Sequence, residues 1–330
     1  MQRFLSAKWI TITFVILFFI GWLIAIYWSS EPDTFNVRTE AHSHAQANSE
    51  NVVVGYTTTH TLIRVVESLM DKPGGYLSND VMPPSVFMDN MPSWEFGVLE
   101  MSRDLALAMR KDFSRSQSQS MENPELIKAQ PALNMNHLGW MLPSAESMYQ
   151  DALKDLYAYR TDLADRSQGS AQFYSRADNL RDWLKQVEKR LGNLSQKLSA
   201  SVGQEILNTD LAGDSNARNS TPEPSQRYEK TSWWKTDDNF YEARGAAWAL
   251  IHFLKAVEVD FADVLEKKNA TVSLRQIIRE LESTQQTIWS PMILNGSGLG
   301  MLANHSLVMA NYISRANAAL IELTELLNQG

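Results

Sequence analysis

The sequence predicts an all-α protein in which an N-terminal transmembrane helix precedes an antiparallel helical bundle with long loops. Residues 9–28 form an uncharged apolar run, and later segments repeat apolar residues at alternating spacings of three and four. Only 15 glycines and 11 prolines occur in 330 residues. Helices bury an apolar stripe with this spacing, whereas turn-dense β proteins need more Gly and Pro. Since no alternating run of useful length is present, no β-sheet is expected.

Composition excludes several functional classes. The chain carries 30 Lys and Arg against 38 Asp and Glu, a net charge of -8, which leaves no broad basic surface for the phosphates of a nucleic acid. It contains no cysteine. Disulfide scaffolds, thiolate metal sites, cysteine nucleophiles and a lipid-modified N-terminal cysteine are therefore excluded.

The strongest signal is the run WITITFVILFFIGWLIAIYW at residues 9–28. At about 1.5 Å per residue, a helix of this length covers the roughly 30 Å of hydrocarbon in a bilayer. Trp9 and Trp28 end the run, where amphipathic rings favour the headgroup layer, and basic residues precede it. We therefore expect residues 1–8 in the cytoplasm, a lipid-embedded anchor over 9–28, and the rest of the chain in the periplasm, outside a bacterial inner membrane.

A cleaved signal peptide and a buried core helix are the alternatives to this anchor. The apolar core of a signal peptide is usually shorter, and it ends in small residues at A-x-A spacing. Here Ala25 is followed two residues later by the large ring of Tyr27. A buried core helix seldom runs this far without one charge. An uncleaved anchor is therefore favoured.

Residues 29–54 are polar and aperiodic, which indicates a tether between the membrane and the domain. They include His42 and His44, but no third or fourth metal ligand is identifiable nearby, so no metal site is expected. The first helical half of the periplasmic domain is expected over 55–207. Its predicted helices cover 58–70, a stretch from a Ser93 cap to Phe113, a stretch from Ser144 to Leu163, and 173–198.

The helix over 173–198 carries the cleanest apolar seam, which is sustained over three heptads. The seam consists of Phe173, Ala177, Leu180, Leu184, Val187, Leu191, Leu194 and Leu198. Two later segments, 247–264 and 309–327, carry matching seams, so packing within one chain is favoured. A homodimer through the 173–198 helix is the alternative.

A mobile loop is predicted over 208–232, because this stretch is rich in Ser, Asn and Asp and contains Gly213, Pro222 and Pro224. It joins the first half to a second helical half over 233–330. In that half, Ser273 and Gln276 form a capping box that opens a further helix.

Four strings of residues resemble the DUF2333 family of proteobacterial membrane-anchored proteins. They are KPGGYLSNDV at 72–81, DNMPSWEFG at 89–97, RKDFSRSQSQS at 110–120 and QFYSRADNLRDW at 172–183. The resemblance extends over most of the chain, including the anchor. It implies the topology given above and supplies no reaction, cofactor or catalytic residue.

One candidate ligand-binding or partner-binding group consists of Trp233, Trp234, Asp238, Glu242 and Arg244. Aromatic rings beside carboxylates are typical of sites that bind or cut glycans. Asp238 and Glu242 share a helix face at i,i+4, but Arg244 is expected to lower a neighbouring carboxyl pKa, which argues against a general acid. A helix start whose aromatics hold the loop to the bundle is the plainer explanation.

The second candidate group consists of Trp94, Glu95, Arg103, Arg110, Asp112 and Arg115. Guanidinium groups at a helix end can hold an anion such as a muropeptide carboxylate or a lipid phosphate. Internal pairing of Arg with Asp explains the same residues. No catalytic residue and no cofactor is assigned, because the GSGLG turn at 296–300 lacks a Walker lysine and no nucleophile elbow is present.

Together these features predict a single-pass inner-membrane protein whose periplasmic domain is an interaction or scaffold component of the cell envelope. An envelope protein is the expected partner, and nucleic acid is not. Confinement at the membrane raises the effective concentration of such a domain near its partner. A periplasmic glycan-binding module or cell-wall hydrolase is the alternative function.

Overall fold

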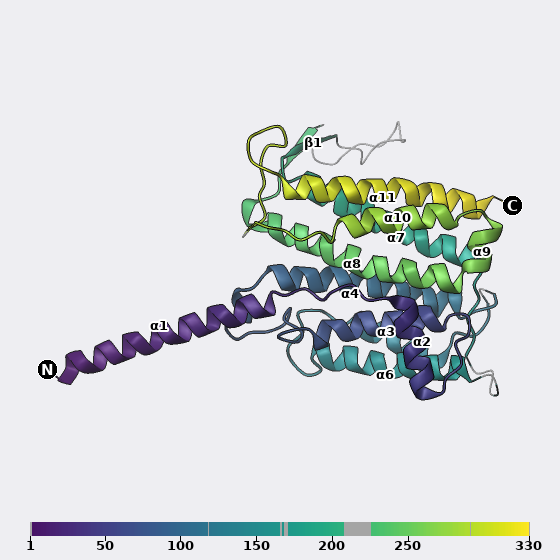
Figure 1. Ribbon diagram of the computed structural model, residues 1–330, viewed down its shortest axis with the longest axis horizontal. Helices are drawn as coiled ribbons and strands as arrows, with labels where there is room; N and C mark the ends of the chain where they lie inside the picture. Colours follow the sequence, from purple (N-terminus) through teal and green to yellow (C-terminus); the bar gives the residue numbers. More distant parts are fainter. Residues whose placement is uncertain are drawn as a thin grey trace, which may run out of the picture.

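The computed structural model describes residues 2–117, 119–165, 167, 171–207, 226–290 and 292–329. Over these residues it confirms an all-α fold. Helix α1 (Gln2–Trp28) projects from one end of a helical bundle (Figure 1). Its Lys8–Trp28 portion is long and apolar enough to cross a membrane, and none of it is buried against the bundle. A signal sequence passes the same test of length and composition.

The described residues contain ten further α-helices. These are α2 (Val37–Asn48), α3 (Tyr56–Asp71), α4 (Asn90–Ala108), α5 (Pro124–Leu133), α6 (Ala145–Ala164), α7 (Ala177–Ser199), α8 (Thr236–Asp260), α9 (Ala262–Lys267), α10 (Thr271–Ser283) and α11 (His305–Asn328). A turn of π-helix, Met109–Phe113, continues α4, and 3-10 turns at Ser85–Phe87 and Trp233–Lys235 precede α4 and α8. The longer helices lie side by side, with their axes close to parallel (Figure 1).

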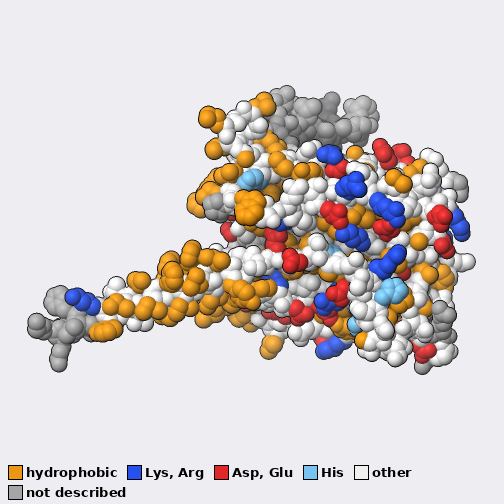
Figure 2. Space-filling view, viewed as in Figure 1, with side chains coloured by type: hydrophobic (Ala, Val, Ile, Leu, Met, Phe, Trp, Pro, Cys, Tyr) orange, Lys and Arg blue, Asp and Glu red, His pale blue; other side chains and the backbone are white. Residues whose placement is uncertain are grey.

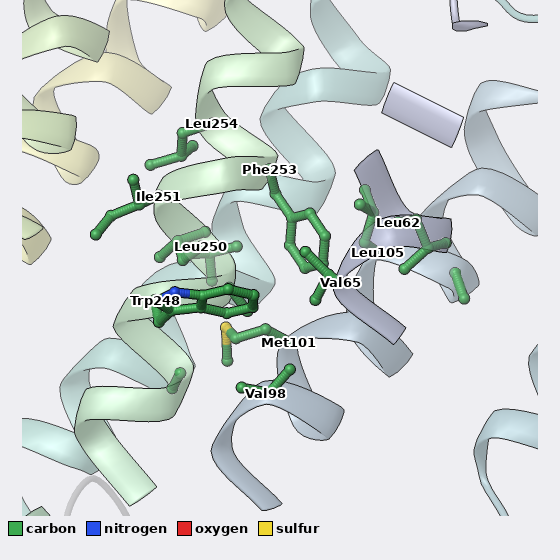
Figure 3. Packing of buried hydrophobic residues seen from close by; sticks show 14 of the residues in the cluster. Leu62, Val65, Val98, Met101, Leu105, Trp248, Leu250, Ile251, Phe253 and Leu254 are labelled. Atoms are coloured by element: carbon green, nitrogen blue, oxygen red, sulfur yellow. The ribbon is translucent and has the colours of Figure 1, made fainter. Parts of the chain in front are cut away.

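Helix α8 lies at the centre of the bundle, against α3, α4, α7, α10 and α11. It is buried almost all round, as expected for a helix with neighbours on every side. The Trp94 and Trp248 rings of α4 and α8 meet with centroids 5.2 Å apart. Figure 3 shows this core, in which side chains of α8 face those of α3 and α4.

Two glycines allow α4 and α8 to cross with their backbones in contact. A Cβ on Gly97 would lie 2.0 Å from the Glu242 carbonyl oxygen, and a Cβ on Gly245 would lie 2.1 Å from the Trp94 carbonyl oxygen. Ordinary contact begins at 3.4 Å. The close approach therefore requires the absence of a side chain on both helices.

The seam predicted in the 173–198 helix is buried inside the chain, where α7 packs antiparallel to α11. Arg181 near the start of α7 donates to Asn328 at 3.1 Å, while Ser195 near its end bonds Ser314 at 2.6 Å. The buried members of the seam are Leu180, Leu184, Val187, Leu191, Leu194 and Leu198. Packing within the bundle thus covers the seam, and a homodimer through this helix stays a prediction.

The structure differs from the tether expected over 29–54. The described chain folds there into α2, capped by Asn36, whose side chain accepts from the Thr39 amide at 3.1 Å. Val37, Ala41 and Ala45 are buried against the bundle. The sequence pattern missed this helix because its buried face consists of one valine and two methyl groups in a polar sequence.

The loop predicted over 208–232 lies outside the described residues from 208 to 225. On either side of that gap, β1 (Gln204–Leu207) pairs antiparallel with β2 (Gln226–Glu229), although no strand was expected. Strands of four residues are too short to show a period, and their pairing depends on residues distant in sequence. Helix α4 also begins earlier than expected, at Asn90, so Ser93 lies inside the helix rather than at its cap.

Candidate functional site

Trp94 and Glu95, which the sequence offered as candidate binding residues, are buried in α4. Lys72 pairs with Glu95 at 2.5 Å, and neither side chain is exposed. The Glu95 carboxylate also accepts from the amides of Leu77 and Ser78, at 2.9 and 2.8 Å. Burial raises the pKa of Glu95, while Lys72 and the amide donors act in the opposite direction. This buried pair fastens the loop after α3 to α4 and leaves no group free for a ligand.

Arg244 joins α8 to the segment that follows α1. Its guanidinium contacts both carboxylate oxygens of Glu31, at 2.9 and 2.7 Å. It also donates to the carbonyl oxygens of Thr284, Gln285 and Gln286 at the end of α10. Arg244 is therefore committed to the scaffold.

His252 forms a second joint between α8 and the same segment. The Phe35 amide donates to His252 Nε2 at 3.1 Å, and His252 Nδ1 lies 2.7 Å from the Trp248 carbonyl oxygen. This pattern assigns the proton to Nδ1 in the neutral ring. Burial lowers the pKa of His252 to about 4. The Phe35 ring stacks on the imidazole with centroids 4.1 Å apart.

Helix α2 is held by a largely buried polar network. Tyr56 donates to Glu50 at 2.6 Å and lies 3.2 Å from His44 Nδ1. Arg160 reaches His60 Nδ1 at 3.0 Å and lies 3.6 Å from Glu50. Burial and the Arg160 charge lower the pKa of His60 to about 3. Each of these side chains thus has at least one partner within the fold, although His60 Nε2 has no hydrogen-bond partner among the described residues.

Three predicted arginines make internal contacts. Arg103 donates to the carbonyl oxygens of Leu133 and Met135. Arg110 pairs with Glu122 at 2.5 Å, and Arg115 donates to the Ser120 carbonyl oxygen at 2.9 Å. The structure therefore brings the members of this group to separate places along α4 and its continuation.

Asp112 and Arg115 line a shallow hollow at the far end of the bundle from α1. Its volume is about 550 Å³, and Lys111, Arg176 and Asp178 line it as well. Burial, followed by the charge of Asp182, raises the pKa of Asp112. The lining mixes both signs of charge, so it favours no anion over a cation.

A groove between α4, α7 and α8 is lined by charged side chains from all three helices. Its first part, of about 480 Å³, is lined by Glu100 and Asp104 of α4, Arg190 and Lys197 of α7, and Glu242 of α8. Arg190 pairs with Glu100 at 2.6 Å and with Asp104 at 2.7 Å, and Lys197 pairs with Glu242 at 2.8 Å. The side chains of Arg190 and Lys197 remain about two-fifths exposed, so the charges face both the groove and solvent.

The second part of this interhelical groove, of about 370 Å³, runs toward the α1 end of the bundle. Phe96 and Glu242 line both parts, which makes the groove continuous. Asp238 lines the second part and lies 3.4 Å from the Ser93 hydroxyl. Burial, followed by the charges of Asp89 and Asp237, raises the pKa of Asp238.

Of the predicted residues, only Asp238 and Glu242 lie in the groove. Trp233 and Trp234 are exposed at the α1 end of the bundle, with ring centroids 4.9 Å apart. Sequence reasoning missed Arg190 and Lys197, since a charged position on an amphipathic helix looks like any solvated face. Their spacing of seven on one side of the apolar seam was the available signal.

Comparison with known proteins returns one family. Residues 2–330 match the model of a family described as "Uncharacterized protein conserved in bacteria (DUF2333)". No curated protein and no solved structure matches the chain. The match covers the exposed helix, the bundle and the groove together.

Proposed function

The chain belongs to the DUF2333 family of bacterial proteins, and from this premise we propose that it is a membrane-anchored interaction or scaffold component of the cell envelope. In this proposal α1 crosses the inner membrane with residues 1–8 in the cytoplasm, and the bundle lies in the periplasm. The interhelical groove binds a charged segment of an envelope protein. The exposed apolar helix α1, fixed to the bundle by Arg244 and His252, is the observation that carries the proposal.

The groove suits recognition better than solitary catalysis. Its cations already pair with carboxylates, but they stay partly exposed, so a partner's own charged groups can exchange with them. Surface pairs of this kind contribute only about 0–1 kcal/mol to folding. Exchanging them therefore costs the bundle little.

Topology is tested by labelling single cysteines, because the natural chain has none. Met121 lies exposed at the far end of the bundle. We expect Met121→Cys to react with a membrane-impermeant maleimide in intact spheroplasts, while Ser6→Cys reacts only after lysis. Tags at both termini should stay on one membrane-bound polypeptide. Labelling of Met121→Cys only after lysis, or loss of the N-terminal tag, would contradict the proposed anchor.

Partner binding is tested by photo-crosslinking in cells. A photoreactive residue at Gln186 or Lys189, both exposed beside the groove, should give a reproducible crosslinked product. The same residue at Val272, which is exposed on α10 away from the groove, should not. Equal products from groove and control positions, or none from either, would refute recruitment through the groove.

A glycan-binding or glycan-cutting role is the second candidate, favoured by one observation. Asp238 and Glu242 both line the second part of the groove, in different environments: Asp238 has a raised pKa, while Glu242 is held by Lys197. Two carboxyl groups set apart in this way are needed by glycan hydrolases. Asp238→Asn and Glu242→Gln should abolish a hydrolase phenotype and leave a scaffold phenotype intact, with the exposed Asp151→Asn as control.

A further inference from the structure

Large apolar side chains are exposed around the end of the bundle from which α1 leaves. They lie in four segments, 81–87, 138–142, 233–234 and the described part of 289–302, which lacks residue 291; we call these segments the apolar rim. Trp289 is 94% exposed and Leu142 is 99% exposed, and Phe87, Trp140, Trp234 and Met301 also project into solvent. Figure 2 shows hydrophobic side chains gathered along α1 and over the loops at this end, with charged side chains over the rest of the visible face.

Direct contacts place the rim beside the anchor. The Trp28 ring at the end of α1 packs against Gly74, just before the first rim segment. Asn79 in turn donates to the Gly139 carbonyl oxygen at 2.8 Å, which joins the first segment to the second. Arg244, which binds Glu31 after the anchor, also holds the carbonyl oxygens at 284–286, where the chain enters the last rim segment.

The chemistry of the rim matches the boundary between lipid headgroups and acyl chains. Three of the four rim segments lie in charge-free stretches: residues 81–88, 134–144 and 284–304 contain no Asp, Glu, Lys or Arg. The fourth, Trp233 and Trp234, is followed by Lys235. Four tryptophans project from the rim, and tryptophan favours this boundary because its ring is apolar and its N–H is polar. Single exposed apolar residues need no explanation, but a contiguous group at one end marks an interaction surface.

We propose that the apolar rim inserts into the surface of the same bilayer that α1 crosses, so that the bundle is seated on the membrane by a second contact. This inference rests on the proposed anchoring by α1. Continuity with α1 selects lipid as the occupant: wherever Trp28 reaches the headgroup layer, the adjoining loops reach it too. The second part of the interhelical groove, lined by Val86 and Leu138 of the rim, then opens at the membrane surface.

The proposal is tested with the full-length protein in vesicles of phosphatidylethanolamine and phosphatidylglycerol, at less than one protein per vesicle. Single cysteines replace Leu142 or Leu299 in the rim, Phe18 in α1, and the exposed controls Met121 and Val272 at the opposite end. Each cysteine carries an environment-sensitive fluorophore. Lipids with a shallow nitroxide serve as quencher for the rim and control labels, and lipids with a nitroxide near the end of the acyl chain serve for Phe18, which lies in the middle of the apolar run at 9–28. Circular dichroism checks that each labelled variant is folded.

We expect the nitroxide lipids to reduce rim fluorescence about twofold, because a rim residue would lie roughly 5–10 Å into the headgroup and acyl boundary. The Met121 and Val272 labels should keep their fluorescence. Quenching at Phe18 without quenching at the rim would overturn the seating and leave the anchor intact. An unquenched Phe18 would overturn the anchor itself. In a separate sample with several proteins per vesicle, energy transfer between donor-labelled and acceptor-labelled rim cysteines, without lipid quenching, would show a second copy as the occupant and also overturn the proposal.

Discussion

Replacing Gly97 by alanine tests the crossing of α4 and α8, on which the centre of the bundle depends. The added Cβ would lie 2.0 Å from the Glu242 carbonyl oxygen and 2.7 Å from the Ala246 amide nitrogen. Both obstacles are backbone atoms inside a helix, so neither can rotate away. The helices must separate by more than 1 Å to reach the ordinary contact distance of 3.4 Å. That separation loosens the packing of Trp94 on Trp248.

The size of the effect follows from two opposing contributions. Overpacking of a filled core costs typically 1–3 kcal/mol and occasionally more, and a backbone obstacle places this case at about 3 kcal/mol. Alanine in place of glycine inside a helix returns about 1 kcal/mol. We therefore expect Gly97→Ala to lower the free energy of unfolding by about 2 kcal/mol. At about 2.1 cal/mol/K of unfolding entropy per residue, the melting temperature of a 330-residue chain then falls by roughly 3 °C.

Gly192 on α7 is the matched control. The nearest atom to a Cβ there is the Asn317 side-chain nitrogen at 3.8 Å, so Gly192→Ala adds helix propensity without a clash. Its free energy of unfolding should rise by up to about 1 kcal/mol. Thermal unfolding of the full-length protein in detergent, followed by circular dichroism, measures both variants. If Gly97→Ala were as stable as Gly192→Ala, the close contact between α4 and α8 would be wrong.

Three further predictions concern buried charges. Burial raises the pKa of Asp260 from 3.8 to about 6, so its contribution to stability is complete below pH 3.8 and lost as the pH rises through 6. In urea unfolding from pH 4 to 7, the free energy of unfolding should fall by roughly 3 kcal/mol relative to Asp260→Asn. Parallel pH profiles for the two proteins would contradict the raised pKa of Asp260. Burial lowers the pKa of His252 from 6.5 to about 4, so its contribution to stability is complete above pH 6.5 and lost as the pH falls through 4. His252→Gln should therefore weaken the pH dependence of the free energy of unfolding over that range. An unchanged pH profile would exclude a buried neutral ring. Arg244→Met leaves Glu31 without its partner, so the free energy of unfolding should fall by about 3–5 kcal/mol and proteolysis of the segment after α1 should become faster. An unchanged rate of cleavage in that segment would show that the contact does not hold it.

Local patterns in the sequence predict most of the bundle. The leucines of α7 and the apolar residues of α11 recur at the helix period, and such a stripe must be covered in a folded protein. Helix α2 escaped this reasoning because Ala41 and Ala45 give its buried face little hydrophobic contrast. The pairing of β1 with β2 escaped it too, since nothing local indicates which distant segment a short strand will meet.

The candidate site was harder to predict because its contacts are non-local. Arg244 and Glu31 are 213 positions apart, and Lys197 and Glu242 are 45 apart. The sequence shows which side chains can form an ion pair, but the folded path of the chain decides which ones meet. Glu95 looked like a surface carboxylate for the same reason, although its partner Lys72 is fully buried with it.

The joints at Arg244 and His252 have a mechanical consequence. A domain joined to a membrane helix by a flexible linker samples a wide volume, whereas a domain fixed to the end of that helix keeps a constant distance from the membrane. Helix α11 is 24 residues long, so the bundle reaches about 36 Å from the root of α1. In the proposed anchoring, the hollow at Asp112 therefore lies at a fixed height above the lipid, and a membrane-bound partner that docks there must itself span that distance.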